Sequence, residues 1–329
     1  MASEQERGQA IADLEWLVQD LLRVEDVMRT AVASSSHQLV NDAAMHLIDA
    51  GGKRLRPALV MITSRSGRVG DRRTDLSAAA VELVHIATLM HDDVIDETNT
   101  RRGVTTVHAR WGIEVAVLSG DYLFARGCSL GAEAGGDVPR ILADAIGRVC
   151  EGQIAETAAV GDPHRSVEHY MSTVEMKTAA LFRAACELGA STSGASGEER
   201  EALASYGAEL GVTFQIVDDL LDLVGDPDVT GKMRGSDLRE GVFTLPVLLA
   251  AARDPRAEAA LSERDRDLDV VLDLVRESGA LETAFREAEA RGRKAREALA
   301  SLGAEAWVNA LRTIVDGVLA QVRDSALAV

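Results

Sequence analysis

The chain is poor in aromatic residues and in cysteine. Aromatic side chains make up 3% of its 329 residues. Its three cysteines, Cys128, Cys150 and Cys186, are scattered along the chain and do not have the spacing of metal ligands. We interpret them as small apolar residues buried in the protein core. A cysteine-ligated metal site is therefore not expected.

Positive charge is also in short supply. Lysine and arginine total 35 against 53 aspartate and glutamate residues, which gives a net charge of -18. Nucleic-acid binding depends on Lys and Arg neutralising phosphates, and binding to anionic lipid needs a polybasic patch, so both are disfavoured. The N-terminal residues lack the features of a signal peptide, and no apolar run reaches the roughly 18 residues of a membrane span. We expect a cytoplasmic protein with no membrane span and no nucleic-acid partner.

Helical periodicity is abundant. Apolar residues recur three and four positions apart along most of the sequence, and Gly, Pro, Asp and Ser clusters separate the helical windows. The predicted helices cover about 9–33, 37–50, 55–66, 74–97, 112–133, 138–158, 166–191, 198–224 and 243–253, with two or three more from about 264 onward. We predict an all-α chain forming a single domain over 1–329, with 1–36 as an N-terminal helical arm and 254–329 as C-terminal helices.

Two segments have the form Asp-Asp-x-x-Asp, at 92–96 and 218–222, and each ends an apolar helical run. On a helix, aspartates four positions apart lie on one face about 6 Å apart, where like charges destabilise the helix. Mg²⁺ relieves such repulsion, because it binds a few carboxylates together with phosphate oxygens of a substrate. A pentapeptide this short also arises by chance, so its neighbours must decide the interpretation.

Those neighbours include cations at separate places in the chain. They are Lys53, Arg54 and Arg56 in GGKRLRP, Arg101 and Arg102 after the first acidic segment, Lys177 in an apolar run, and Lys232 after the second segment. Glycines and arginines before a helix favour phosphate binding, although a basic turn of this kind is also common as a solvated surface. A lysine on an apolar helix face either reaches water or meets an anion. Together, two acidic segments and several cations indicate a site for two diphosphates with metal ions between them.

With these residues, the chain resembles the trans-isoprenyl diphosphate synthases of the polyprenyl synthetase family, of the long-chain kind. The matching segments lie between about residues 40 and 250, in the family's order: GGKRLRP, VELVHIATLMHDDVIDETNTRRG, GDYLFA, EGQ, MKTAALF, FQIVDDLLDLVGDPDVTGK and SDLREGVFTLP. The resemblance implies the isoprenoid synthase fold, a single bundle of long, mostly antiparallel helices around a central cavity, in a homodimer. It implies head-to-tail condensation of isopentenyl diphosphate onto an allylic diphosphate, with loose association with a membrane for product release.

The resemblance also implies a role for each matching residue. The metal ligands, for two or three Mg²⁺ ions per active site, would be Asp92, Asp96, Asp218 and Asp222, with Asp93 and Asp219 as ligands or orienting carboxylates. The allylic diphosphate would be held by Arg101, Lys177 and Lys232, with Thr178 also in the substrate site and Gln215 near the allylic group. Isopentenyl diphosphate would be held by Lys53, Arg56, His85 and Arg102. Val242 stands where the family often has lysine, so one phosphate contact is either weakened or replaced by Arg234 or Arg239.

Product length is predicted from the helix that precedes Asp92. In this family, bulky side chains four, five and eight positions before the first aspartate form a floor beneath the growing product. Here those positions are Thr88, Ala87 and Val84, with Val81 one turn deeper, and none is aromatic. Each helical turn spans 5.4 Å, a little more than one isoprene unit, so small residues leave a tunnel open. We predict a C30 or longer product for quinone side chains, made from a farnesyl or geranylgeranyl primer, with a C20–C25 product as the alternative.

Two other functions fit part of the pattern. A class I terpene cyclase shares the fold and the metal chemistry, but cyclases line their cavities with aromatic rings that stabilise cations, and this chain is 3% aromatic. A non-catalytic partner subunit would be expected to lack one acidic segment, whereas both are intact here. A catalytic synthase is the favoured interpretation.

Overall fold

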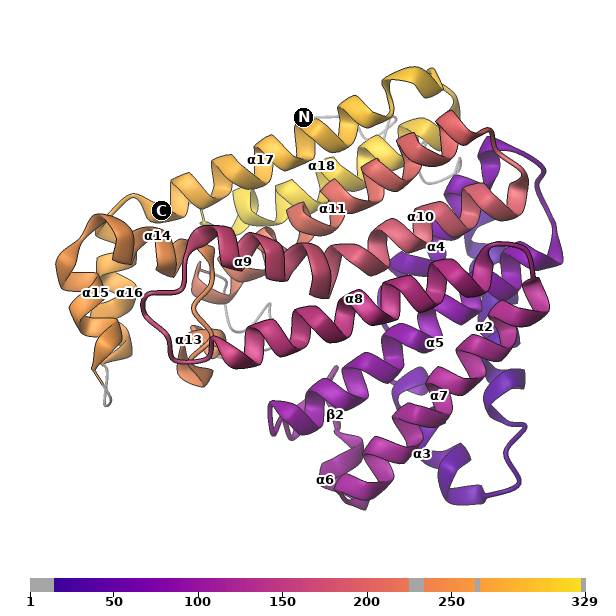
Figure 1. The fold of residues 1–329 in the computed structure, drawn as a ribbon, viewed down its shortest axis with the longest axis horizontal. Helices are drawn as coiled ribbons and strands as arrows, with labels where there is room; N and C mark the ends of the chain where they lie inside the picture. The colour runs from indigo at the N-terminus through magenta and orange to yellow at the C-terminus, as the bar shows by residue number, and fades with distance from the viewer. Residues whose placement is uncertain (1–14, 225–233, 264–266, 327–329) are drawn as a thin grey trace. The chain divides into compact units, whose positions relative to one another are not determined.

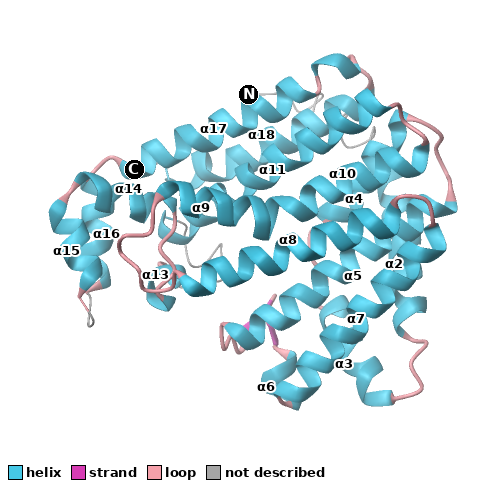
Figure 2. Cartoon of the chain, in the orientation of Figure 1, coloured by secondary structure: helices cyan, strands magenta, loops and turns pink. Residues whose placement is uncertain are grey.

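The computed structural model describes residues 15–224, 234–263 and 267–326. Across these residues the chain is built almost entirely of helices, as predicted (Figure 2). The exception is a small antiparallel hairpin with strands of two residues, in which β1 (Thr100–Arg101) pairs with β2 (Val104–Thr105). Among the described residues, no helix combines the length and the apolar character needed to cross a membrane.

The chain divides into two compact units. The first comprises Met1–Ile146, Ala184–Ala204 and Leu302–Ala310, and the second comprises Gly147–Arg183, Ser205–Ser301 and Leu311–Val329. Each unit therefore contains segments that are far apart in the sequence. The single domain expected from the sequence stays a prediction.

Among its described residues, the first unit contains these complete helices: α2 (Glu15–Val32), α3 (Gln38–Asp49), α4 (Leu55–Thr63), α5 (Arg72–Ile95), α6 (Val107–Trp111) and α7 (Ile113–Ala134) (Figure 1). α5 packs against α2, α4 and α7. The contact between α5 and α7 is close because α7 carries glycine at the interface. A Cβ atom on Gly127 would lie 3.0 Å from the carbonyl oxygen of Ala80, and one on Gly120 would lie 2.2 Å from Nε2 of His91.

The second unit contains α9 (Val167–Val174), a π-helical turn (Glu175–Ala179), α13 (Ser236–Glu240), α14 (Leu245–Arg253), α15 (Pro255–Ser262), α16 (Leu268–Glu277) and α17 (Ala280–Ala298). α14 packs against α9, α15, α16 and α17. In the described part of the chain, long helices that contribute residues to both units are α8 (Val138–Ala158), α10 (Ala180–Ser193), α11 (Gly197–Val224) and α18 (Ala306–Ala326). Short 3₁₀ turns occur at Ser64–Ser66 and Ala300–Leu302.

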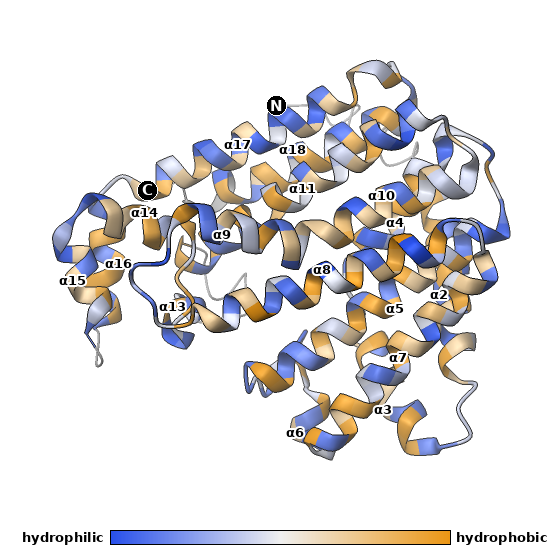
Figure 3. Ribbon diagram, viewed as in Figure 1, coloured by the Kyte–Doolittle hydropathy of each residue, from blue (hydrophilic) through white to orange (hydrophobic). Residues whose placement is uncertain are grey.

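Amphipathic periodicity explains why the predicted helices formed. Apolar and polar residues alternate along the helices in the way expected for packed helical faces (Figure 3). The windows predicted at 37–50, 138–158 and 198–224 match α3, α8 and α11 within one residue at each end. α5 begins two residues earlier than predicted, because the Asp71 side chain caps it by accepting a hydrogen bond from the backbone nitrogen of Arg73. The window predicted at 166–191 is one helical run interrupted by the π-helical turn.

The interpretation of all three cysteines as buried is wrong for two of them. Cys186 is buried, whereas Cys128 and Cys150 are exposed. Each exposed cysteine directly follows a buried helical residue, Gly127 or Val149. One position along a helix turns a side chain by about 100°, which carries it away from the packed face.

Candidate active site

The first acidic segment ends α5. Asp93 is buried, with a relative exposure of 1%, whereas Asp92 is partly exposed and Asp96, the C-cap of the helix, is exposed. Oδ1 of Asp93 accepts a hydrogen bond from Nε of Arg101 at 2.5 Å. Burial raises the pKa of Asp93, and the charge of Arg101 opposes that rise. The middle aspartate therefore faces the protein and orients Arg101, and the outer two are the better placed to bind a metal ion.

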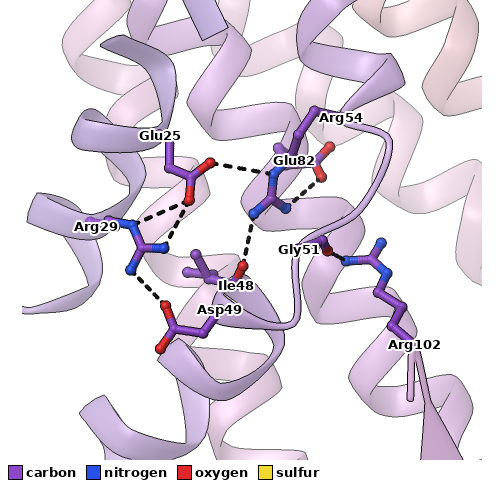
Figure 4. Close-up of polar contacts among 8 residues, drawn as sticks. All are labelled: Glu25, Arg29, Ile48, Asp49, Gly51, Arg54, Glu82 and Arg102. Atoms are coloured by element: carbon purple, nitrogen blue, oxygen red, sulfur yellow. Dashed lines mark hydrogen bonds and ion pairs between the residues drawn. The ribbon is translucent and has the colours of Figure 1, made fainter. Parts of the chain in front are cut away.

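The β1–β2 hairpin directs the side chains of Arg101 and Arg102, which are adjacent in the sequence, to different partners. Its two turn residues, Arg102 (φ 51°) and Gly103 (φ 77°), both have positive φ, as in a type I′ hairpin turn. Arg101 reaches back to Asp93, while Arg102 donates from Nη1 to the carbonyl oxygen of Gly51 in the GGKRLRP loop (Figure 4). Strands of two residues are too short to leave a periodic signal, so the sequence did not predict this hairpin.

The GGKRLRP loop is shaped by its glycines and by Arg54. A Cβ atom on Gly52 would lie 2.7 Å from Cζ of Arg102, so glycine allows the two segments to approach. Arg54, with φ 48°, donates from Nη1 to Oε1 of Glu82 at 3.1 Å and from Nη2 to the carbonyl oxygen of Ile48 at 2.9 Å (Figure 4). Its Nε lies 3.9 Å from Oε2 of Glu25. Arg54 therefore anchors the loop that carries Lys53 and leads into α4, where Arg56 lies.

Four arginines act electrostatically on one histidine in the first unit. The pKa of His85 lies well below its usual 6.5, because of burial first and then because of the charges of Arg56, Arg102, Arg101 and Arg54. Burial likewise lowers the pKa of Arg56, to about 10. His85 is consequently neutral near pH 7 and offers a hydrogen bond rather than a charge. The structure thus brings together Arg56, His85 and Arg102, three of the residues assigned to isopentenyl diphosphate, while Lys53 lies exposed in the neighbouring loop.

The second acidic segment, near the end of α11, repeats the organisation of the first. Asp218 is exposed, whereas Asp219 has a relative exposure of 2%. Asp219 accepts hydrogen bonds from the hydroxyl group of Tyr170 and from Nε2 of Gln215, the latter at 2.8 Å. Burial raises the pKa of Asp219 to about 7, against the effect of these two donors. Here too the middle aspartate is held by protein donors.

Asp222 has a structural contact as well. Its carboxylate accepts hydrogen bonds from the backbone nitrogens of Ser236 at 3.1 Å and Asp237 at 3.3 Å, at the start of α13. Each carboxylate oxygen carries more than one lone pair, so these contacts are compatible with metal binding. Its assignment as a ligand stays a prediction. Lys232 lies outside the described residues.

Lys177 and Thr178 lie in the π-helical turn. The ammonium group of Lys177 donates to Oε2 of Glu156 on α8, so this lysine meets an anion, one of the two outcomes expected from its apolar surroundings. Thr178 donates from Oγ1 to Oε1 of Gln215 at 2.8 Å, which continues the chain of hydrogen bonds to Asp219. Single π turns inside α-helices are often found at functional sites.

Several polar partners of these residues were missed by the sequence analysis. They are Glu82, Glu156 and Tyr170, together with the anchoring role of Arg54. Glu82 carried a usable signal, since it is a single carboxylate in an apolar helical run and its side chain is 2% exposed. Glu156 and Tyr170 lie 21 and 49 residues from their partners, and no local pattern connects them.

The residues assigned to product length lie in the middle of α5. Val81, Val84 and Ala87 are fully buried, and Thr88, which is partly exposed, donates from Oγ1 to the carbonyl oxygen of His85 at 2.7 Å. At the position of the family mismatch, the backbone nitrogen of Val242 donates to the carbonyl oxygen of Asp237 at 2.8 Å. Arg234 and Arg239, the residues considered as replacements for the missing lysine, are both exposed.

The donor chemistry of both clusters suits Mg²⁺. Within the described ranges, no group of three His, Cys, Asp or Glu side chains is arranged as a ready-made metal site. Mg²⁺ does not require one, because it is commonly bound by one or two carboxylates together with water and substrate phosphate oxygens. Oδ2 of Asp93 is buried and has no hydrogen-bond partner among the described atoms, so this carboxylate retains an acceptor.

The fold and these side chains define a class of all-helical proteins with two aspartate clusters and several arginines near the first of them. The model of one such family, polyprenyl synthetase, matches residues 37–277. The chain belongs to the polyprenyl synthetase family.

Individual relatives agree with this membership. The chain is 41% identical over 229 residues to a nonaprenyl diphosphate synthase of Mycobacterium tuberculosis, across 69% of this chain and 68% of that one. A decaprenyl diphosphate synthase from Rhodobacter capsulatus is 36% identical and superposes with a TM-score of 0.89, covering 95% of this chain and 99% of its own. A polyprenyl synthase from Caulobacter crescentus, crystallised with calcium and isoprenyl diphosphate, is 36% identical with a TM-score of 0.88, covering 94% and 97%. The family, the all-α isoprenoid synthase fold and the prenyltransferase class predicted from the sequence are confirmed.

Proposed function

We propose that this chain condenses isopentenyl diphosphate head-to-tail onto farnesyl or geranylgeranyl diphosphate and repeats the step to give an all-trans polyprenyl diphosphate. The observation that carries the proposal is the arginine cluster around His85 in the unit that also holds the first acidic segment. A diphosphate is the kind of ligand that such a cluster stabilises, because arginine forks match phosphate oxygens.

Isopentenyl diphosphate is assigned to Lys53, Arg56, His85 and Arg102. Arg102 is fixed by the hairpin turn, and Arg56 follows a loop that Arg54 anchors. The neutral imidazole of His85 donates one hydrogen bond to the diphosphate without adding charge. This arrangement holds the homoallylic substrate through its diphosphate and leaves its double bond to attack.

The allylic diphosphate is assigned to Arg101, Lys177 and Lys232. Lys177 is paired with Glu156. In our proposal the diphosphate replaces that carboxylate as the partner of the ammonium group. Thr178 and Gln215 form a hydrogen-bonded pair beside Lys177 and orient the allylic group.

Bond breaking in the allylic substrate releases diphosphate and leaves a carbocation. Asp92, Asp96, Asp218 and Asp222 would hold Mg²⁺, as two or three ions per active site, and the bound ions would supply positive charge against the charge that develops on the leaving diphosphate. Lys177 and Arg101 stabilise the same developing charge through fixed donors. Positioning the double bond within about 3 to 3.5 Å of the cation supplies several kcal/mol more. We assign the final proton to the departing diphosphate.

The product is assigned a length of C30 or more, in support of quinone side chains. The small side chains at Val81, Val84 and Ala87, and the long-chain names of the relatives, support this assignment. We further propose that the chain works in the cytoplasm as a homodimer and associates loosely with a membrane when the product leaves. Light scattering of the purified chain tests the dimer.

One assay tests the reaction. The purified chain is incubated with Mg²⁺, isopentenyl diphosphate and either farnesyl or geranylgeranyl diphosphate, and products are analysed by mass. Elongated polyprenyl diphosphates of C30 or more are expected. Hydrocarbon products would identify a terpene cyclase instead. Products that stop at C20–C25 would identify a shorter-chain synthase. Activity that appears only after a partner chain is added would identify a non-catalytic subunit.

A further inference from the structure

Lys177 and Thr178 project from a widened turn of helix. The residues on either side, Val174 and Ala180, have ordinary right-handed helical angles, so the helix continues through Glu175–Ala179 without a break. A π turn accommodates one residue more than an α turn. If this turn relaxed to an α turn, side chains within and beyond it would change direction, by up to about 100° for each residue of register change. The directions of Lys177 and Thr178 therefore depend on what keeps the turn wide.

Two glycines on neighbouring helices make room for the turn. A Cβ atom on Gly152 of α8 would lie 2.4 Å from the backbone nitrogen of Lys177. A Cβ atom on Gly211 of α11 would lie 2.6 Å from Cα of Ala179. Both distances are too short for real carbon atoms. The close approach of α8 and α11 to the π-turn backbone therefore depends on glycine at these two positions. Gly152 also gives the EGQ segment a physical role.

Arg291 of α17 binds the outer side of this turn. Its Nη1 lies 3.5 Å from Oε1 of Glu175, the first residue of the turn, and 3.4 Å from Oε2 of Glu209 on α11. Its Nε donates to Oε1 of Glu287 at 2.9 Å, which orients the guanidinium group from its own helix. With 17% of its side chain exposed, Arg291 is more buried than a typical surface arginine. It therefore connects the turn that carries Thr178 with the helix that carries Gln215.

A pocket of about 500 Å³ lies beside this ion pair, between α9, α14 and α17, and its lining includes Met171, Leu249, Glu175 and Arg291. The side chain of Glu175 is 54% exposed. Packing consequently restrains Glu175 only weakly on that side, where Arg291 is its charged partner.

We propose that Arg291 is a positioning residue, which holds Glu175 and Glu209 together and so keeps the π turn in the geometry that directs Lys177 and Thr178. Arg291 itself touches no reacting group. The proposal deepens the proposed function and rests on it for its kinetic readout, since Lys177 is assigned to the allylic diphosphate.

The test compares Arg291→Met, Arg291→Lys and Glu175→Gln in the full chain. The matched control is Arg296→Met, because Arg296 lies on the same helix and pairs with the exposed Asp316 at 2.7 Å. Arg291→Met and Glu175→Gln should raise KM for the allylic diphosphate about fivefold or more and lower kcat about tenfold. KM for isopentenyl diphosphate should stay within twofold of the parent value, and Arg291→Lys should recover part of the loss.

Hydrogen exchange of the backbone amides in Glu175–Ala179 gives a readout that does not depend on catalysis. Faster exchange in Arg291→Met and in Glu175→Gln, but not in Arg296→Met, supports the positioning role. Unchanged exchange together with unchanged kinetics would overturn the proposal. So would a loss of activity that is equal for both substrates and proportional to the fall in melting temperature of the variant. If the parent chain transfers no prenyl group, the proposed function fails, and the exchange measurement still decides the role of Arg291.

Discussion

Arg54 and Glu82 form a buried ion pair, with 3.1 Å between Nη1 and Oε1 (Figure 4). Burial lowers the pKa values of Arg56 and Arg102, and the charge of Glu82 opposes both shifts. One carboxylate on α5 thus compensates part of the positive charge gathered around His85. Glu82 therefore stabilises the same cluster of cations that diphosphate is proposed to neutralise during turnover.

Replacing Glu82 by glutamine keeps the shape of the side chain and removes its charge. We expect Glu82→Gln to lower the free energy of unfolding by about 3–5 kcal/mol, as for other broken buried ion pairs. Urea unfolding measures the loss. Glu133→Gln is the control, because Glu133 pairs with Arg72 at an exposed site. This substitution should lower the free energy of unfolding by at most about 1 kcal/mol.

Pyrophosphate should raise the melting temperature of Glu82→Gln more than that of the parent. Equal unfolding free energies for parent and Glu82→Gln would contradict the role given to this carboxylate.

The lowered pKa of His85 makes stability depend on pH in a defined direction. Below pH 6.5 the unfolded chain binds a proton at His85 that the folded chain does not. The free energy of unfolding that depends on His85 is therefore at its full value above pH 6.5 and declines as the pH falls. Between pH 7 and 5.5 the parent should lose about 1 kcal/mol more unfolding free energy than His85→Gln does. Urea unfolding at both pH values measures the difference. Parallel curves for parent and His85→Gln would refute the prediction.

Tyr170 lowers the pKa of Asp219 by donating a hydrogen bond to it. Tyr170→Phe should therefore raise that pKa above about 7, so that Asp219 is protonated over more of the neutral range. A hydrogen bond to a charged group contributes about 1.5–3 kcal/mol, so kcat at pH 7 should fall about 10- to 100-fold and recover toward higher pH.

The pH dependence of kcat at saturating substrate measures this effect. Its acidic limb should move to higher pH in Tyr170→Phe. Tyr122→Phe serves as the control, because the Tyr122 hydroxyl donates to the backbone carbonyl of Val32 in the other unit. An unshifted limb in Tyr170→Phe would show that Asp219 does not control the rate.

Ala87→Phe tests the predicted tunnel. Ala87 is fully buried in α5, and a phenyl ring there should block the growing product and shorten it toward C15–C20. Val81→Phe, about two turns earlier on the helix, should give an intermediate length because each turn spans 5.4 Å. Mass analysis of the products decides, with melting temperatures as a check on folding. An unchanged product length in a folded, active Ala87→Phe would remove these positions from length control.

The sequence predicted the helices better than it predicted their interruptions. The bounds of α3, α8 and α11 were predicted to within one residue, because amphipathic periodicity is a local property of the sequence. The β1–β2 hairpin was missed because two-residue strands have no period to detect. The π turn was missed because it leaves the apolar pattern of 166–191 intact and changes only the backbone spacing.

For the active site, the sequence by itself determined the chemical groups: the aspartate clusters, the separated cations and the family they indicate. Only the tertiary structure decided how those groups are used. It turned Asp93 toward Arg101 and Asp219 toward Tyr170 and paired Arg54 with Glu82. It also left Asp92 and Asp218 more exposed than the middle aspartates of their segments. The reason is physical: residue type and spacing are local properties, whereas burial and hydrogen-bond partners depend on segments brought together from distant parts of the chain.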